Sequence, residues 1–228
     1  MIRTALASVF ALWPLAVAAQ TCPLALVLAQ DVSSSVDENE YILQRDGLAA
    51  ALQSEDVKAA ILGNGGIALA VYEWSGRRQS VVVLDWVMLR STADIMAASD
   101  HLRTAKRSNH RFPTALGYAL GFGAGLMAKA PPCNRKVIDL SGDGITNDGF
   151  WPALAYKHFP FDGITVNALA VLGADPDVVD HFTYEVLRGP GAFLETSAGY
   201  EGYERAMTRK LYREIESRVV GDAGFALD

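Results

Sequence analysis

The chain has 228 residues, 50% of them hydrophobic, and its 20 basic and 26 acidic side chains give a formal net charge of −6 at pH 7. An acidic chain is a poor candidate for binding nucleic acid or an anionic membrane surface, so we exclude both as partners. The hydrophobic content, without repeats or Pro- or Ser-rich linkers, predicts one folded domain with a full hydrophobic core.

The N-terminus has the pattern of a secretory signal peptide. Arg3 supplies a positive charge, residues 5–17 are apolar, and residues 16–19 form a small-residue cleavage site. An uncleaved membrane anchor is the weaker alternative, because the stretch falls short of the roughly 20 apolar residues of a spanning helix. We therefore expect residues 1–19 to be removed. Residues 20–228 then form a single exported domain, periplasmic or secreted, with no membrane insertion after cleavage.

Beyond that segment the chain alternates between strand and helix patterns. In chain order we expect a strand at Leu24–Gln30, a helix at Asp37–Leu52, strands at Ile67–Trp74 and Ser80–Leu89, helices at Thr92–Lys106 and Thr114–Lys129, a strand at Arg135–Leu140, a helix at Gly149–His158, a strand at Ile164–Val171, a helix at Asp175–Leu187, a strand at Ala192–Glu195 and a helix at Glu201–Val219. Only residues 75–79 join the second and third strands, which is short enough for a hairpin. The pattern predicts a doubly wound α/β fold, with a mostly parallel six-stranded sheet, one antiparallel edge strand and helices on both faces.

Two of the expected helices carry additional signals. Glycines inside the helix at 114–129 lower its helix propensity and would permit close packing on the sheet. These are Gly117, Gly121, Gly123 and Gly125. In the last helix, apolar residues recur every four positions against a charged face, at Tyr203, Met207, Leu211, Ile215 and Val219. The charged face is therefore expected to point to solvent.

Oxygen-bearing side chains gather where ligands bind in this type of sheet. In open α/β sheets that place lies beyond the carboxyl ends of the strands. Five residues at strand ends or at a helix start are Asp31, Ser33, Ser35, Thr114 and Asp143. Carboxylates and hydroxyls are the groups that a hard divalent cation needs. We therefore expect these residues to bind a divalent cation, Mg²⁺ first, with Mn²⁺ or Ca²⁺ as alternatives.

The two cysteines support the same arrangement of strands. Cys22 and Cys133 each precede a predicted strand, and Asp31 and Asp143 follow them by nine and ten residues. If the two strands are parallel neighbours, the cysteines meet at one end of the sheet and the aspartates at the other. We expect a disulfide between the cysteines, as in exported proteins; two free buried thiols are the alternative that a cytosolic protein would favour.

These motifs resemble those of von Willebrand factor type A (vWA) domains. In that superfamily an Asp-x-Ser-x-Ser sequence, a lone threonine opening a central helix and an aspartate after a later strand form a metal-ion-dependent adhesion site. Here they match residues 31–35, Thr114 and Asp143-Gly144. The chain is also similar to a group of exported bacterial proteins within the superfamily. The resemblance implies that Ser33, Ser35 and Thr114 coordinate the metal, while Asp31 and Asp143 coordinate it directly or through water.

Two positions depart from the vWA pattern. Thr114 follows Phe112-Pro113, where the superfamily usually has glycine, and Asp143 follows Gly142, where threonine is common. Proline restricts the conformation of the residue before it. Neither change removes a ligand, but both can alter loop geometry and metal affinity.

The proposed ligand set leaves a place for a partner. Two carboxylates and three neutral hydroxyls leave at least one position on a divalent cation for an outside oxygen, which an aspartate or glutamate of a partner protein can fill. Binding would then depend on the metal. Basic and aromatic candidates for contact with such a partner are Arg107, His110, Arg111, Phe112, Phe150 and Trp151. Solvated loop charge and core packing of the rings are the alternatives.

Each of these features also has another interpretation. Ser35 and Glu38 have the spacing of a capping box, Thr114 can be an N-cap, and Asp143-Gly144 can be a turn. A phosphatase of haloacid-dehalogenase type, with Asp31 as nucleophile and residues 142–148 as the Mg²⁺-binding loop, is the enzymatic alternative. It lacks the second aspartate that the chemistry needs, because Ser33 stands there. A scaffold domain with an empty site is the third interpretation.

Overall fold

The computed structural model describes residues 22–217, so the expected signal peptide and Val219 lie outside the described part of the chain. The described strands are β1 (Cys22–Asp31), β2 (Ile67–Trp74), β3 (Val81–Leu89), β4 (Cys133–Gly142), β5 (Ile164–Leu172) and β6 (Leu194–Ala198). They form one sheet in the order β3-β2-β1-β4-β5-β6, in which only the β2–β3 pair is antiparallel. The predicted doubly wound α/β fold is confirmed.

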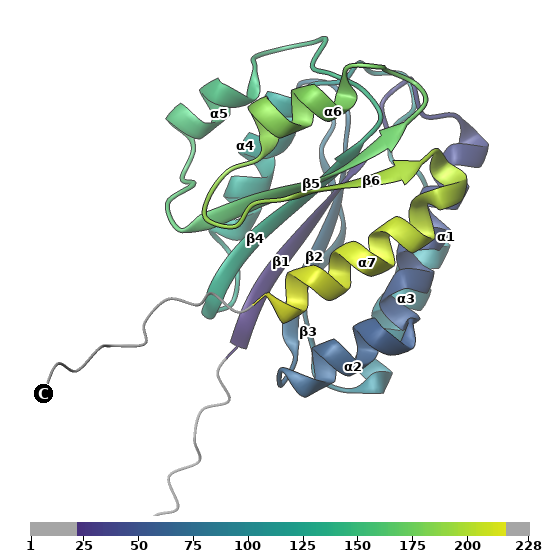
Figure 1. Cartoon of the computed structure of the whole chain (residues 1–228), viewed down its shortest axis with the longest axis vertical. Helices are drawn as coiled ribbons and strands as arrows, with labels where there is room; N and C mark the ends of the chain where they lie inside the picture. The colour runs from purple at the N-terminus through teal and green to yellow at the C-terminus, as the bar shows by residue number, and fades with distance from the viewer. Residues whose placement is uncertain (1–21, 218–228) are drawn as a thin grey trace, which may run out of the picture.

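Helices cover both faces of the sheet (Figure 1). They are α1 (Glu38–Gln53), α2 (Glu55–Gly63), α3 (Thr92–Thr104), α4 (Leu116–Met127), α5 (Pro152–His158), α6 (Val178–His181) and α7 (Tyr203–Glu216). One face carries α1, α2, α3 and α7, and the other carries α4, α5 and α6. A π-helical turn, Phe182–Val186, follows α6, and a 3₁₀ turn, Tyr200–Gly202, precedes α7. Within residues 22–217 no helix is long and apolar enough to cross a membrane.

The helix α2 is absent from the sequence-based prediction, which leaves residues 53–62 as a connection. Ser54 explains the difference, because this one residue is both the C-cap of α1 and the N-cap of α2. Its side chain accepts a hydrogen bond from the Val57 amide, and Glu55 and Asp56 complement the helix dipole in the first turn. A second helix therefore starts at the point where the first one ends.

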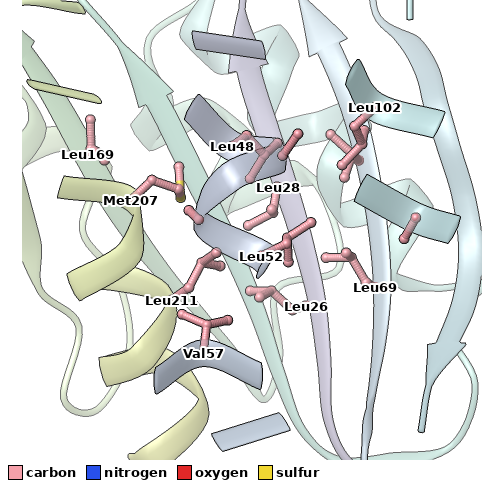
Figure 2. Packing of buried hydrophobic residues seen from close by; sticks show 14 of the residues in the cluster. Leu26, Leu28, Leu48, Leu52, Val57, Leu69, Leu102, Leu169, Met207 and Leu211 are labelled. Carbon is pink, nitrogen blue, oxygen red and sulfur yellow. The ribbon is translucent and has the colours of Figure 1, made fainter. Parts of the chain in front are cut away.

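The two faces of β1 differ in the size of their side chains. Leu24, Leu26 and Leu28 belong to the core cluster under α1, α2, α3 and α7, whereas Ala25 and Ala29 belong to the cluster on the α4 side. Figure 2 shows the larger cluster, with Leu26 and Leu28 beside side chains of α1. Leucines on one face and alanines on the other let α4 approach the sheet closely.

The glycines of α4 serve this close approach only in part. A Cβ at Gly123 would lie 2.9 Å from the Tyr72 hydroxyl of β2, so this glycine does face the sheet. A Cβ at Gly117 would collide with Phe150, and one at Gly121 would lie 2.8 Å from the Phe159 ring. The expectation of packing on the sheet is therefore correct for Gly123 and wrong for Gly117 and Gly121, which admit aromatic rings flanking α5.

The central strands β1 and β4 bring the predicted site together. They are parallel neighbours in which Cys22 pairs with Cys133, and the two cysteines form a disulfide. The predicted disulfide is therefore confirmed. At the opposite ends of the same strands lie Asp31, the last residue of β1, and Asp143, which directly follows β4.

Candidate functional site

The five predicted ligands lie together at the carboxyl ends of the central strands. Thr114 Oγ1 donates a hydrogen bond to Ser33 Oγ at 3.4 Å, and Ser33 Oγ lies 3.0 Å from Ser35 Oγ in a second bond. Ser35 Oγ donates to Asp143 Oδ1 at 2.8 Å. Asp31 joins the group because its Oδ1 accepts the Ser33 amide at 2.7 Å. Hydrogen bonds thus connect three segments that are far apart in the sequence.

Each aspartate of this cluster keeps one oxygen free. Asp31 and Asp143 are 0% and 1% exposed, and Oδ2 of each has no hydrogen-bond partner. Among the ion pairs of residues 22–217, none includes either carboxylate. A buried carboxylate oxygen without a partner is costly to ionise.

The electrostatics of the two carboxylates agree with that arrangement. Burial, with the added charge of Asp143, raises the pKa of Asp31 to about 8, while hydrogen bonds from Ser33 and the charge of Arg107 act in the opposite direction. Burial also raises the pKa of Asp143, against the hydrogen bond from Ser35. Both groups therefore resist carrying a negative charge when no cation is bound.

The helix-capping interpretation fails for two of the five residues. The capping box of α1 is formed by Asp37 and Glu40, not by Ser35 and Glu38. The N-cap of α4 is Ala115, which makes no side-chain hydrogen bond, so Thr114 is not the cap. The hydroxyls of Ser35 and Thr114 point instead to the shared cluster.

A residue that the sequence reasoning did not assign holds Thr114 in place. Asn147 Oδ1 accepts the Thr114 amide at 2.9 Å, and the Asn147 and Asp148 amides donate to the Thr114 carbonyl at 3.0 and 3.2 Å. These contacts fix the segment before α4 against the loop that carries Asp143. The sequence Gly142–Asp148 marked this loop, but under a phosphatase interpretation that gave Asn147 no such role.

One of the two departures from the vWA pattern, Gly142, has a local structural reason. A Cβ at Gly142 would lie 2.9 Å from Asp31 Oδ2, so the side chain of a threonine would crowd the carboxylate. On the other loop, the Phe112 carbonyl accepts the Ser34 amide at 2.8 Å. The Phe112-Pro113 segment is thus attached to the β1–α1 loop, which brings Thr114 next to Ser33.

Arg107 differs from the expectation of an exposed cation on the rim. Its side chain is 8% exposed, and its guanidinium donates to carbonyl oxygens of the β1–α1 loop. The guanidinium also lies over the Tyr41 ring, 5.5 Å from its centroid. Arg107 is therefore packed against the β1–α1 loop and is not free to meet a partner.

The other five candidate contact residues divide into exposed and packed. His110, Arg111, Phe112 and Trp151 are exposed, and Arg111 Nε donates to His110 Nε2 at 2.9 Å. Phe150 is half-buried, with its ring 4.2 Å from that of Tyr118, centroid to centroid, and its backbone against Gly117. Phe150 thus has a packing role, while the exposed four stay predicted contact residues.

Tyr200 is a second residue near the site that no sequence signal marked. It is 4% exposed, and its hydroxyl has no hydrogen-bond partner. Burial, followed by the charges of Asp143 and Asp31, raises its pKa well above the ordinary value. The 3₁₀ turn before α7 therefore places a buried phenol within electrostatic reach of both carboxylates.

The residues present fit a hard cation rather than a soft one. Within residues 22–217 no group of three or more His, Cys, Asp or Glu side chains is arranged to hold a metal ion. The cluster offers two free carboxylate oxygens and three hydroxyls, all of them oxygen donors. Such a set matches the preference of Mg²⁺, Mn²⁺ or Ca²⁺, whereas thiolate and imidazole ligands would favour softer metals.

Solved structures with a similar fold are vWA domains and proteins of adhesion or extracellular matrix. Proximal thread matrix protein 1 from the mussel byssus, with a zinc-occupied MIDAS motif, is 17% identical with a TM-score of 0.61, covering 86% of this chain and 46% of that one. The von Willebrand factor type A protein from Catenulispora acidiphila is 14% identical with a TM-score of 0.60, and the match covers 86% of this chain and 43% of that one. The pilus adhesin SpaC from Lactobacillus rhamnosus GG is 13% identical with a TM-score of 0.59, and the match covers 86% of this chain and 31% of that one.

These similarities establish the fold, and the chain spans less than half the length of each of the three proteins. No curated protein matches the sequence. One protein family matches residues 21–219, which is nearly all of the chain after the expected signal peptide. The protein therefore belongs to the family described as "Protein of unknown function (DUF1194)", and its domain has the vWA-like fold.

Proposed function

We propose that this protein is an exported, metal-dependent protein-binding domain. One observation carries the proposal: Asp31 Oδ2 and Asp143 Oδ2 are buried, lack partners and lie in one cluster with three hydroxyls. A fold that gains nothing from this cluster would not be expected to retain two buried charges without a counterion. A divalent cation supplies that counterion.

The proposed roles follow from the positions of the side chains. Ser33, Ser35 and Thr114 would coordinate the cation through their hydroxyls, and Asp31 and Asp143 would hold it directly or through water. When bound, the cation supplies a site for one outside oxygen. A carboxylate of a partner protein is a suitable ligand there, because a hard cation prefers anionic oxygen donors.

Protein binding and export have support of different kinds. The similar structures include an adhesin and a matrix protein, which favours interaction over catalysis. The disulfide between Cys22 and Cys133 is typical of oxidising compartments and supports export to the periplasm or beyond. The phosphatase alternative gains no similar support, since Ser33 occupies the position of its general acid/base.

The test is thermal unfolding of the oxidised protein in EDTA and in millimolar Mg²⁺, Mn²⁺ or Ca²⁺. A ligand at about 100 times its Kd adds roughly 2.7 kcal/mol, which raises the unfolding temperature by about 5–11 °C in a domain of this size. We expect such a gain for the unaltered protein and none for Thr114→Val, which removes one hydroxyl. Thr208→Val is the matched control, because the Thr208 hydroxyl bonds only within α7, at Glu204 O.

The result separates the three interpretations. A metal-induced shift that Thr114→Val abolishes and Thr208→Val keeps supports the metal site, and metal-dependent capture of an acidic partner protein would then support its use. Equal unfolding temperatures with and without metal would favour the scaffold interpretation. Hydrolysis of a generic phosphate ester, lost in Asp31→Asn, would favour the phosphatase.

A further inference from the structure

The β1–α1 loop is held by one buried guanidinium. Arg107 Nη2 donates to the carbonyl oxygens of Val32 (3.2 Å), Ser33 (3.1 Å) and Val36 (2.7 Å). Its Nη1 donates to the Asp37 carbonyl at 3.3 Å. The loop between β1 and α1 therefore turns four carbonyl groups toward a single side chain that lies 70 to 75 positions further along the chain.

This arrangement decides which groups of the loop face the site. Because the carbonyls converge on Arg107, the hydroxyls of Ser33 and Ser35 remain free to point the other way, where they bond each other and Asp143. Outside itself the loop is also restrained at its backbone by the Val32 amide, which donates to the Trp74 carbonyl at 2.9 Å, and by the Ser34 amide, which donates to the Phe112 carbonyl at 2.8 Å. The hydroxyls of Ser33 and Ser35 add their bonds to Thr114 and Asp143. Without the guanidinium, the Ser33 and Asp37 carbonyls would keep the Val36 and Tyr41 amides as donors, whereas the Val32 and Val36 carbonyls would lose the donor that Arg107 gives them.

Arg107 holds the loop without taking the place of a cation. Its one ion pair within the described chain joins Nη1 to the exposed Glu38 at 3.8 Å, and none joins it to Asp31 or Asp143. The planar guanidinium has five donors in a rigid fork, which suits it to bridge several carbonyls at once. A lysine has a single ammonium centre and cannot span the same set.

We propose that Arg107 is the positioning residue of the metal site: it fixes the β1–α1 loop in the form that presents Ser33 and Ser35 to the cation. This inference rests on the proposed function for its metal dependence. Its structural half, the fixed loop, does not need the metal, so the two can be tested apart.

The chain offers a matched control in Arg45. The Arg45 guanidinium lies over the same Tyr41 ring, 5.7 Å from its centroid, compared with 5.5 Å for Arg107. Its bonds go to Asp46 and to the Ala105 carbonyl, and none goes to the β1–α1 loop. Arg45→Met therefore removes a similar stacked cation while leaving the loop carbonyls bonded.

The experiment measures two quantities for Arg107→Met, Arg107→Lys and Arg45→Met. The first is the Kd for Mg²⁺ and Mn²⁺ by calorimetric titration. The second is the rate of amide hydrogen exchange of residues 33–36 in EDTA. We expect Arg107→Met to raise the Kd at least tenfold and to speed exchange in the loop at least tenfold. Arg107→Lys should recover only part of both effects, and Arg45→Met should stay within twofold of the unaltered protein.

Each outcome has one meaning. Unchanged exchange and unchanged metal affinity in Arg107→Met would overturn the proposal, and so would full recovery in Arg107→Lys, which would show that charge alone matters. If the unaltered protein binds no metal, the proposed function fails, and loop exchange in EDTA still decides whether Arg107 fixes the loop. If Arg107→Met does not fold, the comparison of Arg107→Lys with Arg45→Met carries the same decision.

Discussion

The strand β4 and the residue after it place two buried aspartates four positions apart, and only one of them has an ion-pair partner among the described residues. Asp139, inside the strand, lies 3.0 Å from Lys210 Nζ of α7. Asp143, at the rim, has no ion-pair partner among the described residues, and neither does its neighbour Asp31. The fold therefore provides its own cation for one buried carboxylate and leaves the other two without one.

The internal cluster shows buried carboxylates that have a cation of the chain beside them, although both Asp139 oxygens and Glu214 Oε2 lack a hydrogen-bond partner. Lys210 is 0% exposed and also bonds Glu214 at 2.9 Å, while Asn167 donates to the same Glu214 oxygen at 3.0 Å. One ammonium then serves two carboxylates, and burial raises the pKa of Asp139 to about 7 against the attraction of Lys210. Burial lowers the pKa of Lys210, but the two carboxylates more than reverse this and raise it.

The contrast between the Lys210 cluster and the rim aspartates indicates that the two clusters have different roles. A side chain such as Lys210 gives a permanent counterion that stabilises one arrangement of α7 on the sheet. A site that must accept an outside ligand cannot use a permanent counterion, because the ammonium would occupy the ligand's place. The two free oxygens at Asp31 and Asp143 are consistent with a counterion that enters from solvent, as the proposed function requires.

The largest expected effect comes from removing the internal cation. Lys210→Met leaves Asp139 and Glu214 buried together without a positive charge, which should lower the free energy of unfolding by about 3–5 kcal/mol at pH 7. Urea unfolding measures it. Arg209→Met is the control, because the adjacent Arg209 pairs with Glu195 on the surface and is more than half exposed. A surface pair contributes about 0–1 kcal/mol, so similar losses in the two variants would contradict the comparison.

Removing a rim charge should have the opposite sign. Asp31→Asn keeps an oxygen to accept the Ser33 amide but removes the buried charge, so in EDTA we expect it to raise the free energy of unfolding by about 1–2 kcal/mol. In saturating Mg²⁺ the order should reverse, because the unaltered protein gains roughly 2.7 kcal/mol at 100 times its Kd and the variant does not. Urea unfolding in both buffers measures the crossing.

The matched control for Asp31→Asn is Asp56→Asn, which changes an exposed aspartate in the first turn of α2. It should cost a few tenths of a kcal/mol in both buffers, the usual size of a helix-dipole effect. A destabilised Asp31→Asn in EDTA would mean that the Asp31 charge is already compensated inside the protein. The rim would then resemble the Lys210 cluster, and the contrast between the two regions would fail.

The sequence predicts the features that depend on local pattern. The strand Ile67–Trp74 has the predicted bounds, because a run of residues that favour strands lies between Gly66 and Ser75, which mark its two ends. The pairing of Cys22 with Cys133 follows from the similar spacing of cysteine and aspartate, nine and ten residues, along two strands. That the five oxygen-bearing residues meet follows from the topology of an open sheet.

The features that depend on tertiary partners could not be predicted. Lys210 and Glu214 are charged residues on the buried face of α7, and no local pattern shows that Asp139 of β4 lies there to pair with Lys210. From the sequence, Arg107 is expected to be a cation in an exposed loop, and only the structure shows the carbonyls to which it donates. In each case the partner lies 70 or more positions away in the sequence, and no local pattern reports it.

The last prediction is a pH dependence that tests whether Asp139 shares one cation with Glu214. Since burial raises the pKa of Asp139 from 3.8 to about 7, the folded protein binds this proton more tightly than the unfolded chain does. Its contribution to stability is therefore full below pH 3.8 and is lost as the pH rises to about 7. Asp139→Asn cannot titrate, so the unaltered protein should lose stability relative to the variant by up to about 1.4 kcal/mol per pH unit in that window.

Urea unfolding of both proteins in EDTA at pH 5, 6, 7 and 8 measures the difference, which should level off above pH 7. If the free energies of unfolding of the two proteins change with pH in parallel, Lys210 already compensates the charge of Asp139 in full. The internal cluster would then need no charge from outside, and its contrast with the rim would be larger.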